Sequence, residues 1–476
     1  MQPRGNPPPP IHTREINQHL LESRGASVLY LRRTQEGRFD VRITMIGGGY
    51  VGLVSGACFA EFGTEVTVVE ADATKLAALH AGRMPIFEPG LEKLVNENVA
   101  AGRLSFTGDL VEGVKTAEAV FIAVGTPTRR GDGHADLTYV YAAVEQVARA
   151  LTAPVVIVTK STVPVGTGRR IKEIVRTTRP DLEIDVASNP EFLREGNAIT
   201  DFMRPDRVVI GAETDRAREV LGRLYRPLNL IETPILYTGI ETAELTKYAG
   251  NAFLAMKVTF INEMADLCEK VGADVHDVAR GIGLDGRIGR KFLHPGPGYG
   301  GSCFPKDTLA LVRIAQDHGA PTRLVEATVL VNEARKSGMA MRVIAACGGS
   351  VRGKTIGILG LTFKPETDDM RDSPSLPIVA RLAGDGAIIR AFDPEGMEQA
   401  QPLLPESVAY CRDALDAAAG ADAVILVTEW NEFRALSPVR LRETMRGKVL
   451  VDLRNAWDPL AMRQAGFDYH DIGRAG

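Results

Sequence analysis

A glycine-rich turn between an apolar strand and a helix constrains the fold of this chain more than any other stretch. Residues 41–46, Val-Arg-Ile-Thr-Met-Ile, predict a buried strand, and residues 47–52, Gly-Gly-Gly-Tyr-Val-Gly, follow at once with the spacing G-x-G-x-x-G. An apolar helical pattern covers 53–62, and a second strand over 65–69 ends at Glu70. Strand, turn, helix, strand and acid in this order indicate a dinucleotide-binding unit.

Each of the three glycines of the G-x-G-x-x-G pattern has a physical task in such a unit. Gly47 makes the turn, Gly49 lets the backbone approach a pyrophosphate, and Gly52 packs the helix on the strand. An acid at position 70 accepts a hydrogen bond from a ribose hydroxyl and disfavours a 2'-phosphate, so NAD is expected rather than NADP. The predicted cofactor site of this turn comprises Gly47, Gly49, Tyr50, Val51, Gly52 and Glu70.

Strands continue to alternate with helices along the chain, in two groups. The first group adds predicted strands over 119–124, 155–159 and 184–187. The second group comprises predicted strands over 355–359, 387–392, 422–427 and 448–452. Alternation of this kind predicts parallel, doubly wound sheets. The second sheet lacks a full glycine fingerprint, so a single nucleotide is expected there rather than a second dinucleotide.

The region between the two sheets is predicted to be helical. Apolar residues from Leu245 to Leu267 recur at helical spacing and predict one helix over 242–271, with Gly272 as its stop. A helix of about thirty residues is long enough to bridge two domains, and a dimer core along it is expected. Further helical patterns cover 308–318 and 321–347.

The predicted fold class is therefore α/β, with two doubly wound Rossmann-like domains joined by a long central helix. The first forty residues begin with prolines and lack the apolar core of a secretory signal, so they are interpreted as a dispensable extension. The predicted parts are a poorly ordered extension over 1–40, an NAD-binding domain over 41–235, a central helical dimerisation domain over 236–339, and a second nucleotide-binding domain over 340–476.

Composition excludes several classes of function. A net charge of -4 provides no basic excess to neutralise phosphates, so nonspecific nucleic-acid binding is not expected. No apolar run approaches the roughly 20 residues of a membrane span. The cysteines are odd in number and widely spaced, which indicates neither a disulfide framework nor a zinc site and favours a reducing cytoplasm. They are Cys58, Cys268, Cys303, Cys347 and Cys411.

The densest glycine run of the chain ends on reactive side chains. Residues 294–307, His-Pro-Gly-Pro-Gly-Tyr-Gly-Gly-Ser-Cys-Phe-Pro-Lys-Asp, bring a thiol, an ammonium and a carboxylate within five positions. The run is typical of a catalytic loop, but a surface loop with an inward-facing cysteine fits it as well. The two nucleotide-sized sheets on either side of the run favour the catalytic interpretation.

Two pairs of polar residues have helical spacing. Glu191 and Glu195 follow the strand over 184–187 and would share one face if their segment is helical, although acids at a helix start often only compensate the helix dipole. Lys247 and Asn251 lie four apart on the long helix, beside its apolar stripe. Taken alone, that second pair is better interpreted as a solvated edge.

The motifs taken together resemble the UDP-glucose/GDP-mannose dehydrogenase family over about residues 41 to 465. Glu70 stands where the family usually has Asp, and Gly48 where it usually has Ala, and both changes preserve the chemistry. The blocks that carry the resemblance, in order, are 47–52, 87–91, 124–128, 161–166, 189–196, 247–251, 298–307, 363–365 and 368–371.

The resemblance implies a four-electron oxidation of a primary alcohol on a sugar nucleotide to a carboxylate, with two hydride transfers to NAD. Cys303 would hold the aldehyde as a thiohemiacetal that becomes a thioester, and water would hydrolyse the thioester. Nearby cations are expected to lower the pKa of the Cys303 thiol. UDP-glucose is the expected substrate, bound by residues 340–476 and converted to UDP-glucuronate. GDP-mannose or a UDP-N-acetylhexosamine is the alternative.

Two other classes of protein compete with this interpretation. A catalytically silent nucleotide-sugar-binding protein would not need Cys303, Lys247 and Asp307 together. A two-electron hydroxyacid dehydrogenase shares the first sheet and a helical region, but needs neither a nucleophilic cysteine nor a second nucleotide-sized sheet. The dehydrogenase of sugar nucleotides therefore ranks first.

The resemblance also assigns roles to individual residues. Lys247 and Asn251 would stabilise an oxyanion at the reacting carbon. Asp307, with Thr162, would order a water for proton removal, and Glu191 would help to hydrolyse the thioester.

Further binding residues follow from the same resemblance. Arg287 would reach the substrate across the interface of a homodimer, which is the expected assembly. The implied substrate contacts are Glu191, Phe192, Leu193, Lys247, Asn251, Arg287, Tyr299, Gly300, Phe363 and Lys364. The implied cofactor contacts outside the glycine turn are Lys75, Thr126, Thr162, Glu195, Lys306 and Arg371, of which Glu195 and Arg371 would also lie near the sugar nucleotide. No metal ligand is implied.

Overall fold

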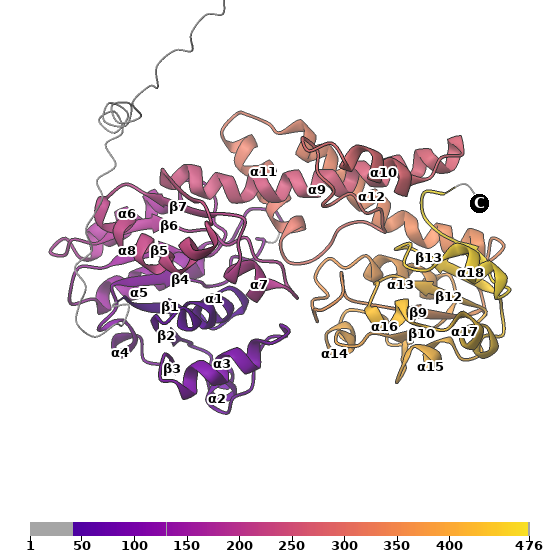
Figure 1. The fold of residues 1–476 in the computed structure, drawn as a ribbon, viewed down its shortest axis with the longest axis horizontal. Helices are drawn as coiled ribbons and strands as arrows, with labels where there is room; N and C mark the ends of the chain where they lie inside the picture. Colours follow the sequence, from indigo (N-terminus) through magenta and orange to yellow (C-terminus); the bar gives the residue numbers. More distant parts are fainter. Residues whose placement is uncertain (1–40, 130, 475–476) are drawn as a thin grey trace, which may run out of the picture. The chain divides into compact units, whose positions relative to one another are not determined.

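The fold contains two mostly parallel sheets with helices on both faces, as the sequence predicts (Figure 1). The computed structural model describes residues 41–129 and 131–474, so the predicted extension over 1–40 lies outside the described residues. The division into domains at 235/236 and 339/340 stays a prediction.

The first sheet has eight strands in the order β3-β2-β1-β4-β5-β6-β7-β8. Neighbouring strands are parallel except for the pair β6 and β7. The order reverses between β1 and β4, and ligands of such sheets bind beyond the carboxyl ends of the strands at this point. The strands are β1 (Arg42–Ile46), β2 (Glu65–Val69), β3 (Leu104–Thr107), β4 (Ala119–Ile122), β5 (Val156–Thr159), β6 (Asp185–Ser188), β7 (Val208–Ala212) and β8 (Ile235–Thr238).

Apolar residues on both faces of this sheet form two cores. Phe121 of β4 packs into one core, while Val120 and Ile122 of the same strand pack into the other, because successive side chains of a strand point to opposite faces. The covering helices are α1 (Tyr50–Glu61), α2 (Ala73–His80), α3 (Leu91–Ala100), α4 (Leu110–Val114), α5 (Thr138–Ala150), α6 (Thr167–Thr178), α7 (Ala198–Met203), α8 (Asp215–Leu224) and the 3-10 helix η1 (Arg226–Ile231).

The second sheet has six parallel strands in the order β11-β10-β9-β12-β13-β14. Ile358 and Ile425 face one core, and Leu359 and Leu426 face the other. The strands are β9 (Thr355–Leu359), β10 (Ile388–Phe392), β11 (Ala409–Tyr410), β12 (Ala423–Leu426), β13 (Val449–Asp452) and β14 (Asp468–His470). The helices are α13 (Ser375–Gly384), α14 (Met397–Ala400), α15 (Ala414–Ala418), α16 (Asn431–Arg434), α17 (Pro438–Thr444) and α18 (Pro459–Gln464).

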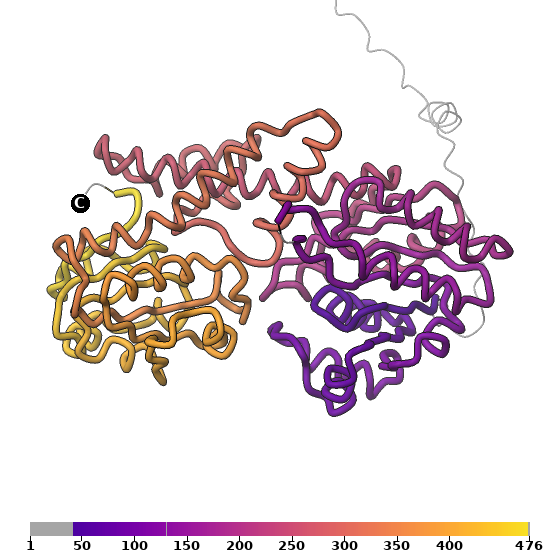
Figure 2. Tube along the Cα trace, turned by 180° about the vertical axis from the view of Figure 1, so that it is seen from behind, coloured from indigo at the N-terminus to yellow at the C-terminus, as the bar shows by residue number. Residues whose placement is uncertain are grey.

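The long helix α9 (Ile240–Val271) connects the cores of both sheets. Ile240 packs into a core of the first sheet, whereas Ile261 and Cys268 pack into a core of the second. The helix has 32 residues and ends at Gly272, which takes the left-handed conformation with φ 79°. It packs along α10 (Val275–Gly283), α11 (Phe304–Asp317) and α12 (Arg323–Ala346), and its pairing with α12 is visible in Figure 1 and, from behind, in Figure 2.

The apolar stripe that predicted α9 is not its buried face. Leu245, Phe253, Phe260 and Leu267 are each 44–57% exposed, while the neighbouring stripe that carries Lys247 is buried. The interpretation of Lys247 and Asn251 as a solvated edge is therefore wrong. Among the described residues, no helix is both long enough and apolar enough to cross a membrane.

Candidate active site

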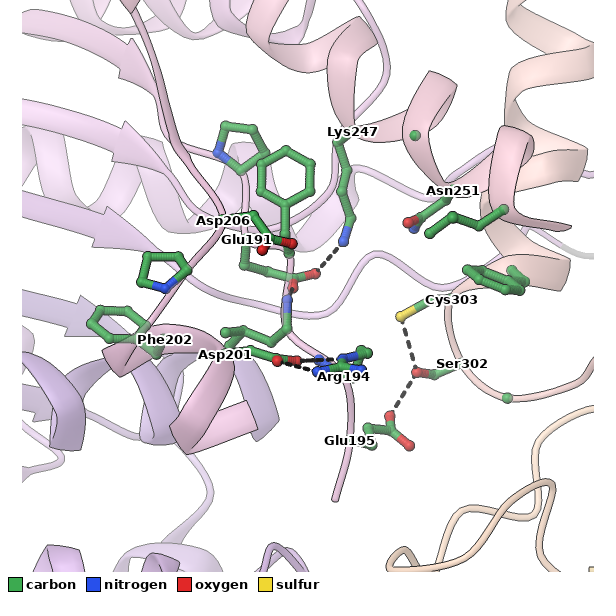
Figure 3. A pocket seen from close by; sticks show the side chains of 18 of the residues that line it. Glu191, Arg194, Glu195, Asp201, Phe202, Asp206, Lys247, Asn251, Ser302 and Cys303 are labelled. Carbon is green, nitrogen blue, oxygen red and sulfur yellow. Dashed lines mark hydrogen bonds and ion pairs between the residues drawn. The ribbon is translucent and has the colours of Figure 1, made fainter. Parts of the chain in front are cut away.

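A pocket of about 740 Å³ brings together residues from four distant parts of the chain. Glu191 comes from the segment after β6, Lys247 and Asn251 from α9, and Cys303 from the start of α11 (Figure 3). Lys364 comes from the turn after β9. The volume suits a ligand of nucleotide size. Of the sequence-predicted residues, the pocket lining includes Glu191, Phe192, Leu193, Glu195, Lys247, Asn251, Gly300, Cys303, Phe363 and Lys364.

Cys303 is the N-cap residue of α11, and its carbonyl oxygen accepts a hydrogen bond from the Asp307 N–H at 2.8 Å. The helix begins four residues earlier than the predicted pattern over 308–318. The signal for this start was present, because Pro305 occupies the first turn, where proline is favoured. Cys303 is partly exposed, whereas the other four cysteines are buried.

The thiol of Cys303 is not activated by cations in the way the sequence suggested. Burial raises the pKa of Cys303 by more than the Lys247 ammonium lowers it, and the carboxylates of Glu191 and Asp307 raise the pKa further. Desolvation disfavours the thiolate more strongly than one ammonium favours it. The expectation of a lowered pKa is therefore wrong for the protein without ligands.

Lys247 and Glu191 form a buried ion pair. Lys247 Nζ lies 2.9 Å from Glu191 Oε1, and the two side chains are 3% and 6% exposed. Burial lowers the pKa of Lys247, but the nearby acidic groups, Glu191 foremost, together outweigh burial and the pKa is raised. Burial raises the pKa of Glu191, but Lys247 outweighs it and the pKa is lowered. Both groups are therefore charged at neutral pH.

Asn251, which lines the pocket, forms a second polar pair with Asp307. Asn251 Nδ2 donates to Asp307 Oδ2 at 2.6 Å, and Lys306 Nζ lies 2.5 Å from Asp307 Oδ1. Contacts to both of its oxygens fix the Asp307 carboxylate, and the carboxylate in turn fixes the orientation of the Asn251 amide. Lys306 thus meets Asp307 rather than the sulfur.

The segment that carries Glu191 and Glu195 is not helical. Residues 189–194 are irregular, and the next helix, α7, begins only at Ala198. The two acids consequently have different partners. Glu195 Oε1 accepts from Ser302 Oγ at 2.7 Å and from Arg371 at 3.3 Å. Burial, together with the charge of Asp369, raises the pKa of Glu195 to about 7.

The glycines before Cys303 let two segments of the protein approach closely. A Cβ on Gly300 would lie 2.4 Å from the Asp372 carbonyl oxygen, and one on Gly301 would lie 2.6 Å from the Phe363 ring. Gly301 also has φ 86°. Larger residues cannot take these places without moving the loop after β9 away from the sulfur.

The turn after β1 has the geometry that a dinucleotide requires. Gly47 has φ 106°, and a Cβ on Gly52 would lie 1.9 Å from the Gly47 carbonyl oxygen, so Gly52 permits the contact between helix and strand. No described atom lies within 4 Å of a Cβ on Gly49, and no described side chain caps the first turn of α1. The N–H groups of that turn can therefore meet a pyrophosphate.

The other predicted cofactor residues of the first sheet lie at the carboxyl ends of its strands. Glu70 follows β2 and accepts from the Gly48 N–H at 2.8 Å. Thr126 follows β4, and its hydroxyl donates to the Thr162 carbonyl oxygen, which follows β5, at 3.0 Å. Lys75 is exposed on the first turn of α2.

Tyr50 and Val51 lie in the first turn of α1, beside this edge of the sheet. The Tyr50 hydroxyl donates to the buried carboxylate of Glu88, which also accepts from the Gly196 and Ala198 N–H groups. Glu88 thereby ties the cofactor turn to the segment that carries Glu195.

Several predicted residues lie outside the pocket lining. Arg287 pairs with Asp285, and its side chain is 90% exposed. Tyr299 is buried, and its backbone exchanges two hydrogen bonds with the Asn332 side chain. Thr162, Asp307, Lys306 and Arg371 also lie outside the lining.

Sequence reasoning missed four polar residues at this site. Lys160 is buried, donates to Asn189 Oδ1 at 2.9 Å, and has its pKa lowered to about 7 by burial. Its place directly after a strand was an available signal. The Arg207 guanidinium stacks 3.6 Å over the Phe192 ring. The Ser302 N–H donates to Asp369 Oδ2 beside Cys303. The sequence had singled out only residues close to these two, Cys303 and Arg371.

The fold and the site define an NAD-dependent dehydrogenase. Three domains of one family match the chain in order: the NAD binding domain over residues 41–229, the central domain over 241–334 and the UDP binding domain over 357–459. The chain belongs to the UDP-glucose/GDP-mannose dehydrogenase family. Its cofactor is NAD, which fits the open turn at Gly49 and the acid at Glu70.

Individual relatives are similar over nearly the whole chain. The UDP-glucose 6-dehydrogenase of Rhizobium meliloti (strain 1021) is 61% identical, over 91% of this chain and 100% of the relative. The UDP-glucose 6-dehydrogenase TuaD of Bacillus subtilis (strain 168) is 45% identical, over 91% and 93%. The solved structure of a UDP-glucose dehydrogenase from Pyrobaculum islandicum is 39% identical, over 93% and 100%, with a TM-score of 0.85.

Proposed function

We propose that this enzyme oxidises UDP-glucose to UDP-glucuronate through a covalent intermediate on Cys303. The observation that carries the proposal is that Cys303 opens onto the same pocket as the buried Lys247–Glu191 pair. A nucleophile, a charged donor and an ionised base then surround one reacting carbon. The names of the relatives favour UDP-glucose, and the match of residues 357–459 to a UDP binding domain agrees with a uridine nucleotide.

The first oxidation needs a base and a donor at the primary alcohol. Asp307, with Thr162, orders the water that removes the hydroxyl proton. Lys247 and Asn251, which are both buried, donate hydrogen bonds to the oxygen and stabilise the negative charge that develops on it. NAD, when bound, accepts one hydride in each of the two oxidations.

The second oxidation begins when Cys303 adds to the aldehyde. The thiolate adds to the carbonyl carbon and gives the alkoxide of a thiohemiacetal, whose C–S bond keeps the aldehyde in the pocket. This alkoxide loses a hydride and becomes a thioester. Glu191, kept ionised by Lys247, takes a proton from the water that attacks the thioester. The carboxylate product leaves, and the sulfur of Cys303 is freed from the acyl group.

The test follows NADH formation by the purified protein with one sugar nucleotide at a time. Two NADH per UDP-glucose are expected. Turnover of GDP-mannose or a UDP-N-acetylhexosamine, with no turnover of UDP-glucose, would contradict the assignment of UDP-glucose as the substrate. Cys303→Ser is expected to stall the reaction before the second equivalent of NADH while NAD binding survives. Cys411→Ser makes the same atomic exchange in a core of the second sheet and is the control. A silent binding protein would form no NADH with any substrate.

The proposed assembly is a homodimer in the cytoplasm. Leu245, Phe253, Phe260 and Leu267 form an exposed apolar face along α9, which a second copy of the chain would cover. Light scattering is expected to give twice the mass of one chain, and a monomer would contradict the dimer. A reducing compartment keeps the Cys303 thiol free, as the proposed chemistry requires.

A further inference from the structure

Ser302 lies between the sulfur of Cys303 and a carboxylate that the chemistry so far does not use. Ser302 Oγ is 3.5 Å from Cys303 Sγ and 2.7 Å from Glu195 Oε1, and Figure 3 shows the three side chains as one chain of contacts. A serine hydroxyl has one proton to donate. Because Ser302 gives that proton to the carboxylate, the contact with Cys303 has the thiol as its donor. The thiol proton therefore already points along a path to Glu195.

We propose that Ser302 passes the proton of the Cys303 thiol to Glu195 when the sulfur becomes a nucleophile. This inference rests on the proposed covalent function of Cys303. The S–H bond breaks and its proton moves to Ser302 Oγ, while the Ser302 proton moves to Glu195 Oε1. The thiolate and a neutral Glu195 result, so charge and protons balance. The Ser302 hydroxyl, now carrying the proton that came from the thiol, then donates a hydrogen bond to the thiolate.

The proton returns by the same path at the end of the cycle. Hydrolysis of the thioester by water releases the sulfur as a thiolate. Glu195 gives its proton back to Ser302, and Ser302 protonates the sulfur. One pair of residues thus serves both the formation and the release of the covalent intermediate.

The other acids near the sulfur are poorer acceptors. Glu191 is held as an anion by Lys247, and its pKa is lowered. Asp307 accepts from Asn251 and Lys306 on its two oxygens. Among the described residues, the side-chain hydrogen bond of the Cys303 sulfur is made with Ser302 Oγ.

The surroundings of Glu195 suit a group that gains and loses a proton. Burial and the charge of Asp369 raise its pKa to about 7, while Ser302, Arg371 and Lys364 act in the opposite direction. Of the charges near Cys303, Lys247, Lys364 and Arg371 favour the thiolate, whereas Glu191 and Asp307 oppose it. A carboxylate with a pKa near neutrality can accept a proton and return it within one turnover.

The test measures the rate of Cys303 alkylation by iodoacetamide against pH, in the full-length protein without ligands. Mass spectrometry distinguishes Cys303 from the four buried cysteines. Ser302→Ala removes the hydroxyl, so alkylation near pH 7.5 is expected to slow about tenfold, equivalent to one unit of thiol pKa. Ser302→Thr keeps the hydroxyl and is expected to restore most of the rate. Glu195→Gln, which cannot take a proton, is expected to remove the inflection near pH 7.

The matched control is Thr367→Val. The Thr367 hydroxyl also donates to Glu195, at 3.3 Å, but no contact joins it to Cys303 among the described residues. Its effect on alkylation is expected to stay within about twofold, well below one unit of pKa. Identical pH profiles for wild type, Ser302→Ala and Glu195→Gln would overturn the relay, and so would equal effects of Ser302→Ala and Thr367→Val. Alkylation needs no substrate, so this result is independent of whether UDP-glucose is oxidised.

Discussion

The two sheets share a strand order and the start of their first turn, but they differ in how the acid after the second strand is used. Gly47 after β1 and Gly360 after β9 both have positive φ, at 106° and 91°. Glu70 follows β2 and Asp393 follows β10 in corresponding places. Glu70 accepts from two backbone N–H groups and retains lone pairs for a ligand.

Asp393, in contrast, is used by the protein itself. It is 0% exposed and its donors are the backbone N–H groups of Leu361, Thr362, Glu395 and Gly396, the Thr362 hydroxyl and the Trp430 indole. In addition, α1 begins directly after its glycine turn, whereas α13 begins only at Ser375. The same topology can therefore accept a dinucleotide where the acid and a helix N-terminus stay available, and not where the chain occupies them.

Removal of Asp393, the acid of the second sheet, is expected to have the largest effect on stability. Asp393→Ala is expected to lower the free energy of unfolding by at least about 4 kcal/mol, because each buried donor left unpaired costs about 1–3 kcal/mol. Denaturant unfolding without ligands measures the change. The control is Asp458→Ala, which removes a single capping bond to the Ala461 N–H and should cost about 1 kcal/mol. Equal losses would show that Asp393 does not organise the turn.

The first sheet also has a buried acid at a turn, with fewer donors. Glu244 of α9 accepts only from the Gly166 and Gly168 N–H groups at the start of α6 among the described residues. Burial raises its pKa from 4.5 to about 7, so the folded protein holds a proton that the unfolded chain has lost. Stability from this group is present below pH 4.5 and is lost as the pH rises to about 7.

Glu244→Gln tests whether this carboxyl group makes the free energy of unfolding fall as the pH rises. The variant is expected to flatten the fall in unfolding free energy between these pH values by at most about 3 kcal/mol. Unfolding curves at pH 5 and pH 8 measure the difference. Glu263→Gln, at an exposed position on the same helix, should leave the pH dependence unchanged. An unchanged slope for Glu244→Gln would mean that the two N–H groups keep the carboxylate ionised.

The smallest expected effect concerns Glu70, whose spare lone pairs distinguish the first sheet. Glu70→Ala is expected to weaken NADH binding roughly ten- to hundredfold, because a hydrogen bond to a charged group is worth about 1.5–3 kcal/mol. The preference for NADH over NADPH should narrow as well. Fluorescence titration measures both, with Glu65→Ala at the exposed start of β2 as the control. Unchanged NADH affinity would contradict a ribose contact.

Local patterns predicted much of the fold, because buried parallel strands are short apolar runs. The predicted strands over 65–69 and 355–359 match β2 and β9 at both ends. Strands β3, Leu-Ser-Phe-Thr, and β14, Asp-Tyr-His, were missed because they are short and partly polar. Their pairing partners, rather than their own composition, make them strands.

The site was harder to predict, because its contacts join residues far apart in the sequence. Lys247 is buried only because Glu191, 56 positions earlier, neutralises it, and no local pattern reports such a pair. The periodicity of α9 predicted a helix but not its buried face, since an apolar stripe and a polar stripe lie side by side. Ser302 went unnoticed because the carboxylate that it contacts, Glu195, is 107 positions away.

Helix α9 has a consequence for how the site opens to solvent. Its first residue lies in a core of the first sheet, its last third lies in a core of the second, and Lys247 and Asn251 lie between. We expect the backbone amides around these two residues to exchange slowly with solvent, because the helix is anchored in a core at both ends. Lys247 and Asn251, the groups proposed to meet the substrate, are therefore expected to lie on one of the slower-exchanging segments of the molecule.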